Sequence, residues 1–152
     1  MEVLIKRLSN EKGNQPPMPF YATVGSAGMD LTANITDPLL LKRGSMARVP
    51  TGIAIGLPHS ECVAYIYARS GLGVRYGICL SNGVGVIDSD YRGEISVGLI
   101  NLGPADYTIE PGERIAQMVF APVLRAELIE AENLPETERG SGGFGSTGRS
   151  SR

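Results

Sequence analysis

Residues 85–93 read Gly85-Val86-Ile87-Asp88-Ser89-Asp90-Tyr91-Arg92-Gly93. Val86 and Ile87 are typical of the apolar end of a strand, Gly93 indicates a turn, and residues 94–99 return to strand-forming side chains. We therefore predict a hairpin whose tip carries Asp88, Asp90 and Tyr91. Catalytic groups are often held on loops by a rigid sheet, but an aspartate at a turn also commonly caps the turn backbone. Both interpretations stay open for this stretch alone.

The rest of the chain repeats this alternation of short strands and turns. Its 152 residues include 20 glycines and 10 prolines, and β-rich runs recur between them about every 8–12 residues. This spacing favours an all-β barrel or sandwich. The predicted strands are residues 3–8, 28–33, 39–41, 47–49, 52–57, 62–67, 78–80, 84–87, 95–102, 107–109 and 115–123.

Helical signals are weak. Residues 70–76 can form one or two helical turns with Ser70 as the N-cap, whereas residues 124–132 fit neither helical nor strand periodicity cleanly and stay ambiguous. Beyond residue 134 the chain becomes polar, and its last part is rich in glycine and serine, which cannot build a core. We therefore expect a β-barrel core of residues 1–134 and a flexible, Gly-rich C-terminal arm of residues 135–152.

Composition argues against several kinds of site. The chain has two cysteines, Cys62 and Cys79, which suit semi-buried thiols in strands, and one histidine, His59, whose surroundings indicate an exposed turn. Histidine-based nucleophile systems and histidine-rich zinc sites therefore have little support. Carboxylates must do any acid–base work, and the expected metal is a hard, oxygen-binding ion such as Mg²⁺.

Charge and hydropathy bear on partners and location. The formal net charge is -2 at pH 7, and no basic stripe is evident, so a nucleic acid polymer is not an expected partner. No apolar run is long enough to span a bilayer, and no secretory leader is evident. We expect no membrane association and a cytoplasmic location.

Four further polar stretches suit anion or metal chemistry without being diagnostic. Arg69 and Ser70 follow the most apolar strand, where they could form an anion pocket or a plain helix cap. Asp30 and Gln117 lie within apolar strands and need polar partners. Residues 143–150 nearly match a Walker A loop, but too little sequence follows to open the helix that a P-loop fold requires.

Five stretches together are more specific than any one of them, and they resemble the five ordered motifs of the trimeric dUTPase family. The resemblance runs from near Phe20 to the C-terminus, with the motifs in the expected order. The five stretches are Ala27-Gly28-Met29-Asp30-Leu31, Arg69-Ser70-Gly71-Leu72, residues 85–93 as quoted above, Pro111-Gly112-Glu113-Arg114-Ile115-Ala116-Gln117, and Arg139-Gly140-Ser141-Gly142-Gly143-Phe144-Gly145-Ser146-Thr147-Gly148.

That family hydrolyses dUTP to dUMP and pyrophosphate with Mg²⁺, which keeps uracil out of DNA and supplies dUMP for dTMP synthesis. The resemblance implies that Asp88 is the general base that activates the attacking water, and that Asp30 and Gln117 act on Mg²⁺ through water molecules. It also implies a jelly-roll-like distorted β-barrel with one short helix, a strand at residues 124–132, and a homotrimer with active sites at subunit interfaces.

The resemblance implies a substrate site as well, over which the arm closes as a lid. Its implied residues are Arg69, Ser70, Gly71 and Gln117 at the phosphates, Asn82, Gly85, Val86 and Ile87 at the uracil edge, Tyr91 against the deoxyribose, Phe144 over the uracil ring, and Arg139, Gly145, Ser146 and Thr147 covering the phosphates.

Three alternatives accompany this interpretation. The dCTP deaminase branch shares the fold and some motifs, but resembles glutamate-based chemistry without an Asp-x-x-Tyr hairpin of this form. A non-catalytic member could bind dUTP or a partner protein as a regulator, although the intact Asp88 argues against that. A structural jelly roll without a ligand would leave the five motifs unexplained.

Overall fold

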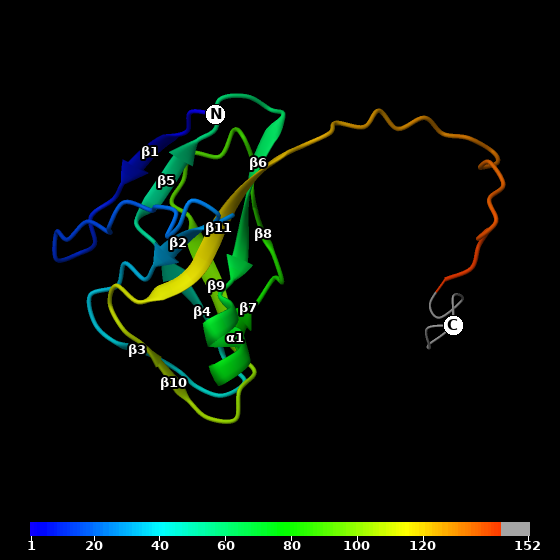
Figure 1. The fold of residues 1–152 in the computed structure, drawn as a ribbon. Coiled ribbons are helices and arrows are strands. Elements are labelled where there is room, and N and C mark those ends of the chain that lie inside the picture. The colour runs from blue at the N-terminus through cyan, green and yellow to red at the C-terminus, as the bar shows by residue number, and fades with distance from the viewer. Residues whose placement is uncertain (144–152) are drawn as a thin grey trace.

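The computed structural model describes residues 1–143, and within them the chain is all-β with a single short helix (Figure 1). This confirms the predicted fold class. The elements in chain order are β1 (Leu4–Arg7), β2 (Met29–Thr32), β3 (Leu39–Leu41), β4 (Met46–Pro50), β5 (Ile53–Gly56), β6 (Cys62–Ala68), α1 (Ser70–Tyr76), β7 (Ile78–Leu80), β8 (Gly85–Ile87), β9 (Ser96–Asn101), β10 (Tyr107–Ile109) and β11 (Arg114–Pro122).

The strands are hydrogen-bonded into four small sheets. The largest has the order β2-β11-β6-β8, the second has the order β4-β9-β7, and β1-β5 and β3-β10 form two antiparallel pairs. Every pairing is antiparallel. Among residues 1–143 no sheet closes into a hydrogen-bonded barrel, so the body is a stack of short sheets around a shared core.

Period-two alternation places that core between the sheets. In β9, Val97, Leu99 and Asn101 are buried while the residues between them are more exposed, as expected for a strand with one face on the core. β6 supplies buried Ala64 and Ile66 from the largest sheet. Burying a large aliphatic side chain contributes roughly 1.5–3 kcal/mol, so this shared core fixes the largest sheet, which carries Asp30, Gln117 and residues 85–87 of the predicted site.

The predicted hairpin at residues 85–99 is wrong. β8 pairs with β6 of the largest sheet, whereas β9 pairs with β4 and β7 of the second sheet. Residues 88–94, here called the tip loop, therefore carry the chain from one sheet to the other. The loop is attached at its end, where the Ile95 N–H donates to the Ile53 carbonyl at 2.8 Å.

The predicted helix has the expected bounds, but its cap differs. Arg69 occupies the N-cap position without a side-chain capping bond, and Ser70 is the first helical residue, so the prediction of Ser70 as the cap is wrong. The helix ends at Gly77, whose φ of 71° is the left-handed conformation that glycine adopts most easily. No helix described in residues 1–143 is long and apolar enough to cross a membrane.

The strand expected at residues 124–132 is also wrong for this chain. The structure assigns no helix or strand from Val123 to Gly143, and Figure 1 shows this segment leading away from the body. A strand needs a hydrogen-bonding neighbour, and no strand among residues 1–143 pairs with residues 124–132. The large apolar side chains of the segment are solvent-exposed, namely Leu124, Leu128, Ile129 and Leu134.

Candidate active site

Most of the predicted site residues that the structure describes fall into two groups at opposite ends of β6. The first group, here called the arginine cluster, consists of Asp30, Arg69, Arg114 and Gln117 at the junction of β2, β6 and β11. The second group is the tip loop together with β8.

Asp30 is the centre of the arginine cluster. Its Oδ1 accepts a hydrogen bond from Arg69 Nε at 2.8 Å, and its Oδ2 accepts one from Arg114 Nη1 at 3.1 Å. Arg69 Nη1 also donates to the Arg114 carbonyl at 3.3 Å. Two guanidinium groups face one carboxylate, so the cluster keeps one net positive charge. Such a charge, held on half-exposed side chains, suits an anionic ligand.

Gln117 lies beside Asp30 in the register of β11 and β2. Its Nε2 donates to the Ala68 carbonyl at 3.1 Å, while its Oε1 accepts no hydrogen bond from any residue in the described part of the chain. A Cβ added at Gly28 would come within 3.0 Å of this oxygen. Gly28 therefore leaves the space in which the amide oxygen of Gln117 lies.

Arg114 is a residue of this cluster to which the sequence analysis assigned no role. Alternate residues of a regular strand share a face, so Arg114 and Gln117, three apart, are expected on opposite faces. A register shift between Arg114 and Ala116 breaks this alternation, and such irregularities re-aim side chains. The sequence itself carries no clear signal of the shift.

The turn before β11 also helps to place Arg114. Glu113 accepts hydrogen bonds from the Glu110 N–H at 3.0 Å and from the Tyr107 hydroxyl. Burial and the neighbouring Glu113 carboxylate raise the pKa of Tyr107. The phenol therefore keeps its proton and remains a donor at neutral pH.

Ser70 and Gly71 are exposed at the first turn of α1, immediately after Arg69. Amides in the first turn of a helix have no intrahelical acceptor, so those of Ser70 and Gly71 are available beside the Arg69 guanidinium. The anion pocket predicted at this position therefore stays a prediction, whereas the plain cap by Ser70 is wrong.

The tip loop is held by its backbone. The Tyr91 N–H donates to the Asp88 carbonyl at 3.2 Å, and Arg92 Nη1 donates to the Ser89 and Tyr91 carbonyls. In the described residues, the carboxylates of Asp88 and Asp90 make no hydrogen bond. The turn is therefore not closed by an aspartate cap, and the exposed Asp88 carboxylate is free to act on a ligand.

Two hollows open beside Asp88. One has a volume of about 310 Å³ and is lined by Arg48, Ile87, Asp88 and Tyr91, among others. The other has a volume of about 390 Å³ and lies on the side of Tyr65 and Asp88. Because β8 is an edge strand of its sheet, half of its backbone groups face away from β6 and can pair with a ligand.

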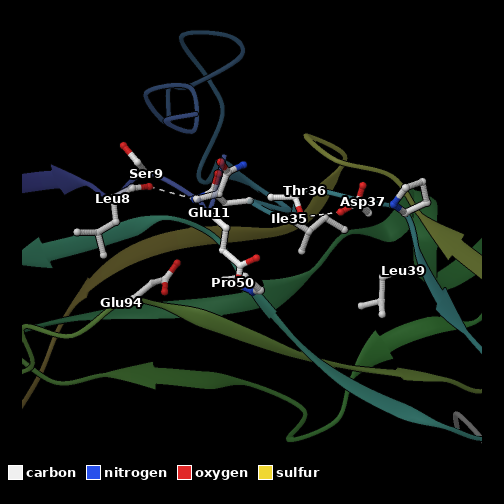
Figure 2. A pocket seen from close by; sticks show the side chains of 12 residues that line it. Leu8, Ser9, Glu11, Ile35, Thr36, Asp37, Leu39, Pro50 and Glu94 are labelled. Atoms are coloured by element: carbon white, nitrogen blue, oxygen red, sulfur yellow. Dashed lines mark hydrogen bonds between the residues drawn. The ribbon is translucent and has the colours of Figure 1, made fainter. Parts of the chain in front are cut away.

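A third hollow, of about 370 Å³, contains none of the predicted site residues (Figure 2). It is lined by Leu8, Ile35, Leu39 and Glu94, among others. At its rim Lys12 forms an ion pair with Asp37 at 2.9 Å. The hydrogen bonds from Lys12 and Thr36 lower the pKa of Asp37, so this carboxylate stays ionised and already has its partners.

The two groups of site residues lie at opposite ends of β6. Ile87 of β8 pairs with Ala64, so Asp88 lies next to Val63, and both line the same hollow. Arg69 follows Ala68 at the other end of β6. The six residue steps from Val63 to Arg69 span about 20 Å.

The remaining predicted residues have less defined surroundings. Asn82 is exposed in the turn after β7, and Arg139 Nε donates to the Gly142 carbonyl at 3.2 Å. Phe144, Gly145, Ser146 and Thr147 lie outside the described residues.

The donor set at the arginine cluster constrains how a metal could bind. Residues 1–143 contain no group of three or more His, Cys, Asp or Glu side chains that could hold an ion. Asp30 and Gln117 offer oxygen atoms only, and both Asp30 oxygens already accept from arginines. This fits Mg²⁺, which keeps several waters and binds mainly through substrate phosphates, and it does not fit an all-protein metal cage.

An all-β scaffold that carries a positively charged arginine cluster and an exposed carboxylate suits a hydrolase that acts on phosphoanhydride bonds. Comparison with known proteins names the family. The dUTPase family model matches residues 14–148, and the chain belongs to the dUTPase family.

Individual relatives agree. The deoxyuridine 5'-triphosphate nucleotidohydrolase of Desulfitobacterium hafniense is 53% identical over 137 residues, covering 90% of this chain and 91% of that protein. The enzyme of the same name from Salmonella typhi is 51% identical over 145 residues, covering 95% and 96%. A solved structure of a mutant Staphylococcus bacteriophage 80alpha dUTPase with dUpNHpp has a TM-score of 0.85 at 25% identity, covering 97% of this chain and 99% of that one.

Proposed function

We propose that this chain is a dUTP diphosphatase that hydrolyses dUTP to dUMP and pyrophosphate, with Asp88 as the general base. The observation that carries this proposal is the Asp88 carboxylate, which is exposed and accepts no hydrogen bond from any described residue. It lies beside Tyr91 and the edge strand β8, in a chain that belongs to the dUTPase family. Asp88 would accept a proton from the water that attacks the α-phosphorus. General bases of this kind typically contribute 10²–10⁴-fold to the rate.

The arginine cluster would bind the triphosphate. Arg69 can turn from Asp30 to a phosphate oxygen because Arg114 continues to hold the other carboxylate oxygen. The Ser70 hydroxyl, the Ser70 and Gly71 amides and the Gln117 side chain would complete the contacts. The Ser70 and Gly71 amides are in place before substrate arrives, and preorganised donors of this kind supply much of the stabilisation in phosphoryl transfer.

Mg²⁺ would be held at the same end of the site by the substrate phosphates and, through water, by Asp30 and Gln117. When bound, it would neutralise charge on the triphosphate. The support for this assignment is the oxygen-only donor set and the lack of any direct metal-binding group among residues 1–143.

The tip loop and β8 would select the base and the sugar. The outward backbone of Gly85, Val86 and Ile87 and the Asn82 amide would pair with the uracil edge, and cytosine would leave buried groups unpaired there. Tyr91 would lie against the deoxyribose and exclude a 2′-hydroxyl. Phe144 would stack on the uracil ring, while Arg139, Gly145, Ser146 and Thr147 would cover the phosphates.

We propose that the working unit is a homotrimer whose sites combine segments of different copies. Two observations support this. The tip loop and the arginine cluster are separated by about 20 Å within one chain, and four large apolar residues beyond β11 are exposed in the described part of the chain. Docked on a neighbour, residues 123–134 would bury those side chains, and the arm, residues 135–152, would reach a neighbouring site.

The proposal is tested by measuring pyrophosphate release in Mg²⁺ from dUTP, dCTP, dTTP and UTP separately, with ammonia followed in parallel. Pyrophosphate from dUTP alone is expected. Ammonia from dCTP would place the chain in the deaminase branch, and no turnover by the folded protein would indicate a nucleotide-binding regulator.

A further inference from the structure

The Tyr91 ring lies against the backbone of Gly93, two residues further along the tip loop. A Cβ added at Gly93 would lie 2.6 Å from Tyr91 Cζ and 3.0 Å from Cε2, and would also collide with the hydroxyl oxygen. Gly93 does not have a positive φ. Glycine is therefore required at this position to make room for the ring, and not to permit an unusual backbone conformation.

The hydroxyl of the same ring is held by the next residue. Tyr91 Oη donates to the Glu94 carbonyl at 2.9 Å. The Gly93 backbone therefore contacts the ring and the Glu94 carbonyl binds its hydroxyl, although 44% of the Tyr91 surface is exposed. Tyr91 also lines the hollow of about 310 Å³ beside Asp88, so the held ring remains accessible to a ligand.

Glu94 is in turn attached to the core. Its Oε1 accepts a hydrogen bond from the Gly52 N–H at 2.7 Å. The carbonyl of the following residue, Ile95, accepts from the hydroxyl of fully buried Thr51 at 2.6 Å. Gly52 has a φ of 68° and lies against the Leu8 carbonyl, so this anchor belongs to a tightly packed part of the body.

We infer that Gly93 and Glu94 are positioning residues that fix the Tyr91 ring as one wall of the sugar site. The hydrogen bond between Glu94 and Gly52 makes this wall rigid enough to reject a ribose. The inference rests on the proposed function, in which Tyr91 faces the sugar. A side chain that excludes a single hydroxyl group must keep a fixed position, because a ring that can rotate or shift would make room for the 2′-hydroxyl. Rigidity of the wall, and not only the presence of Tyr91, then sets the discrimination.

Two kinds of substitution test this. Gly93→Ala pushes the ring off its support without straining the backbone. Glu94→Ala removes the acceptor for the Gly52 N–H, whereas Glu94→Gln keeps an amide oxygen in its place. Gly25→Ala, at a glycine with open space and no positive φ, and Glu61→Ala, at an exposed glutamate, are the matched controls.

The readout is the ratio of kcat/KM for dUTP to that for UTP, with melting temperature measured on every variant. Gly93→Ala should lower the ratio by about tenfold or more, the scale on which one pocket contact discriminates. Glu94→Ala should lower it by about fivefold, as the loss of one hydrogen bond predicts. Glu94→Gln and both controls should keep the wild-type ratio.

The inference is overturned if folded Gly93→Ala keeps the wild-type ratio, or if Glu94→Gln loses selectivity as far as Glu94→Ala does. If Gly93→Ala does not fold, the comparison of the two Glu94 variants decides. A wild type that hydrolyses dUTP but whose variants stay selective contradicts this inference alone. A wild type with no preference for dUTP over UTP contradicts the proposed function as well.

Discussion

The arginine cluster and the tip loop hold their charged groups in opposite ways. In the cluster, the carboxylate of Asp30 is bound by two guanidinium groups, one from Arg69 at the N-cap of α1 and one from Arg114 of β11. In the tip loop, backbone bonds and Arg92 fix the chain while the Asp88 carboxylate has no partner among the described residues. Paired charges suit binding because their geometry is set in advance, whereas a base must be left free to take a proton.

The distance between the two regions is as informative as their chemistry. Both are built on β6, one at each end, and a rigid strand cannot fold to bring them together. If the reaction needs both, one copy must supply the base and another the phosphate-binding groups. The predictions below separate the two regions and then test whether they cooperate across copies.

The largest effect is expected from removing the free carboxylate. Asp88→Asn should lower kcat for dUTP by about 10²–10⁴-fold, because it removes the general base and keeps the side-chain shape. The KM should change little, since the amide leaves the binding groups in place. Steady-state kinetics on Asp88→Asn and on the neighbouring control Asp90→Asn measure this. Comparable losses in the two variants would remove Asp88 from its special role.

Removing the arm should affect activity without affecting the body. β11 ends at Pro122, so a chain lacking residues 139–152 should keep the wild-type circular dichroism and melting temperature. Its turnover of dUTP should fall by about 10²-fold, because a lost clamp on the phosphates misplaces the reacting groups. Unfolding of the shortened chain would show that residues 139–152 belong to the folded body and would contradict the proposed division at residue 134.

Mixing two inactive variants tests whether the two regions cooperate across copies. Arg69→Ala damages the arginine cluster and Asp88→Asn damages the tip loop, so trimers of either variant alone should be nearly inactive. Refolding them together at equal concentration should restore about a quarter of the wild-type rate, since half of each region is intact and pairs at random. Refolding each variant with itself is the control. An inactive mixture that is shown to contain mixed trimers would place both regions of a site in one chain.

Much of the fold can be predicted from local sequence. The bounds predicted for residues 39–41, 78–80 and 107–109 and for the helix at 70–76 are those of β3, β7, β10 and α1. Turn residues end each of these elements, and such signals are local. Strand pairing is not encoded locally, so the hairpin prediction at residues 85–99 fails: β9 pairs with β4 and β7 instead of β8.

The site shows the same limit. The types of residue needed, such as Asp88 and Arg69, can be recognised from their motifs. Arg114 joins the cluster because of a register irregularity in β11. The contacts of Gly93 and Glu94 with the Tyr91 ring depend on how the tip loop folds back. The separation of the two regions follows from the pairing of β6 with β8. These are tertiary facts that no short stretch of sequence encodes.

The smallest effect is expected within the arginine cluster, where partners can compensate for one another. Asp30→Asn removes the charge that Arg69 and Arg114 share, so Mg²⁺ loses an indirect partner while the phosphates still meet two guanidinium groups. The Mg²⁺ concentration for half-maximal activity should rise about tenfold, as for other groups that act on a metal through its ligands. The affinity for dUpNHpp without Mg²⁺, measured by calorimetry, should not fall. Asp37→Asn, which disturbs only the distant pair with Lys12, should change neither quantity. Weaker dUpNHpp binding by Asp30→Asn in the absence of Mg²⁺ would instead mean that Asp30 mainly orients the arginines, and that the paired charges of this region serve the phosphates alone.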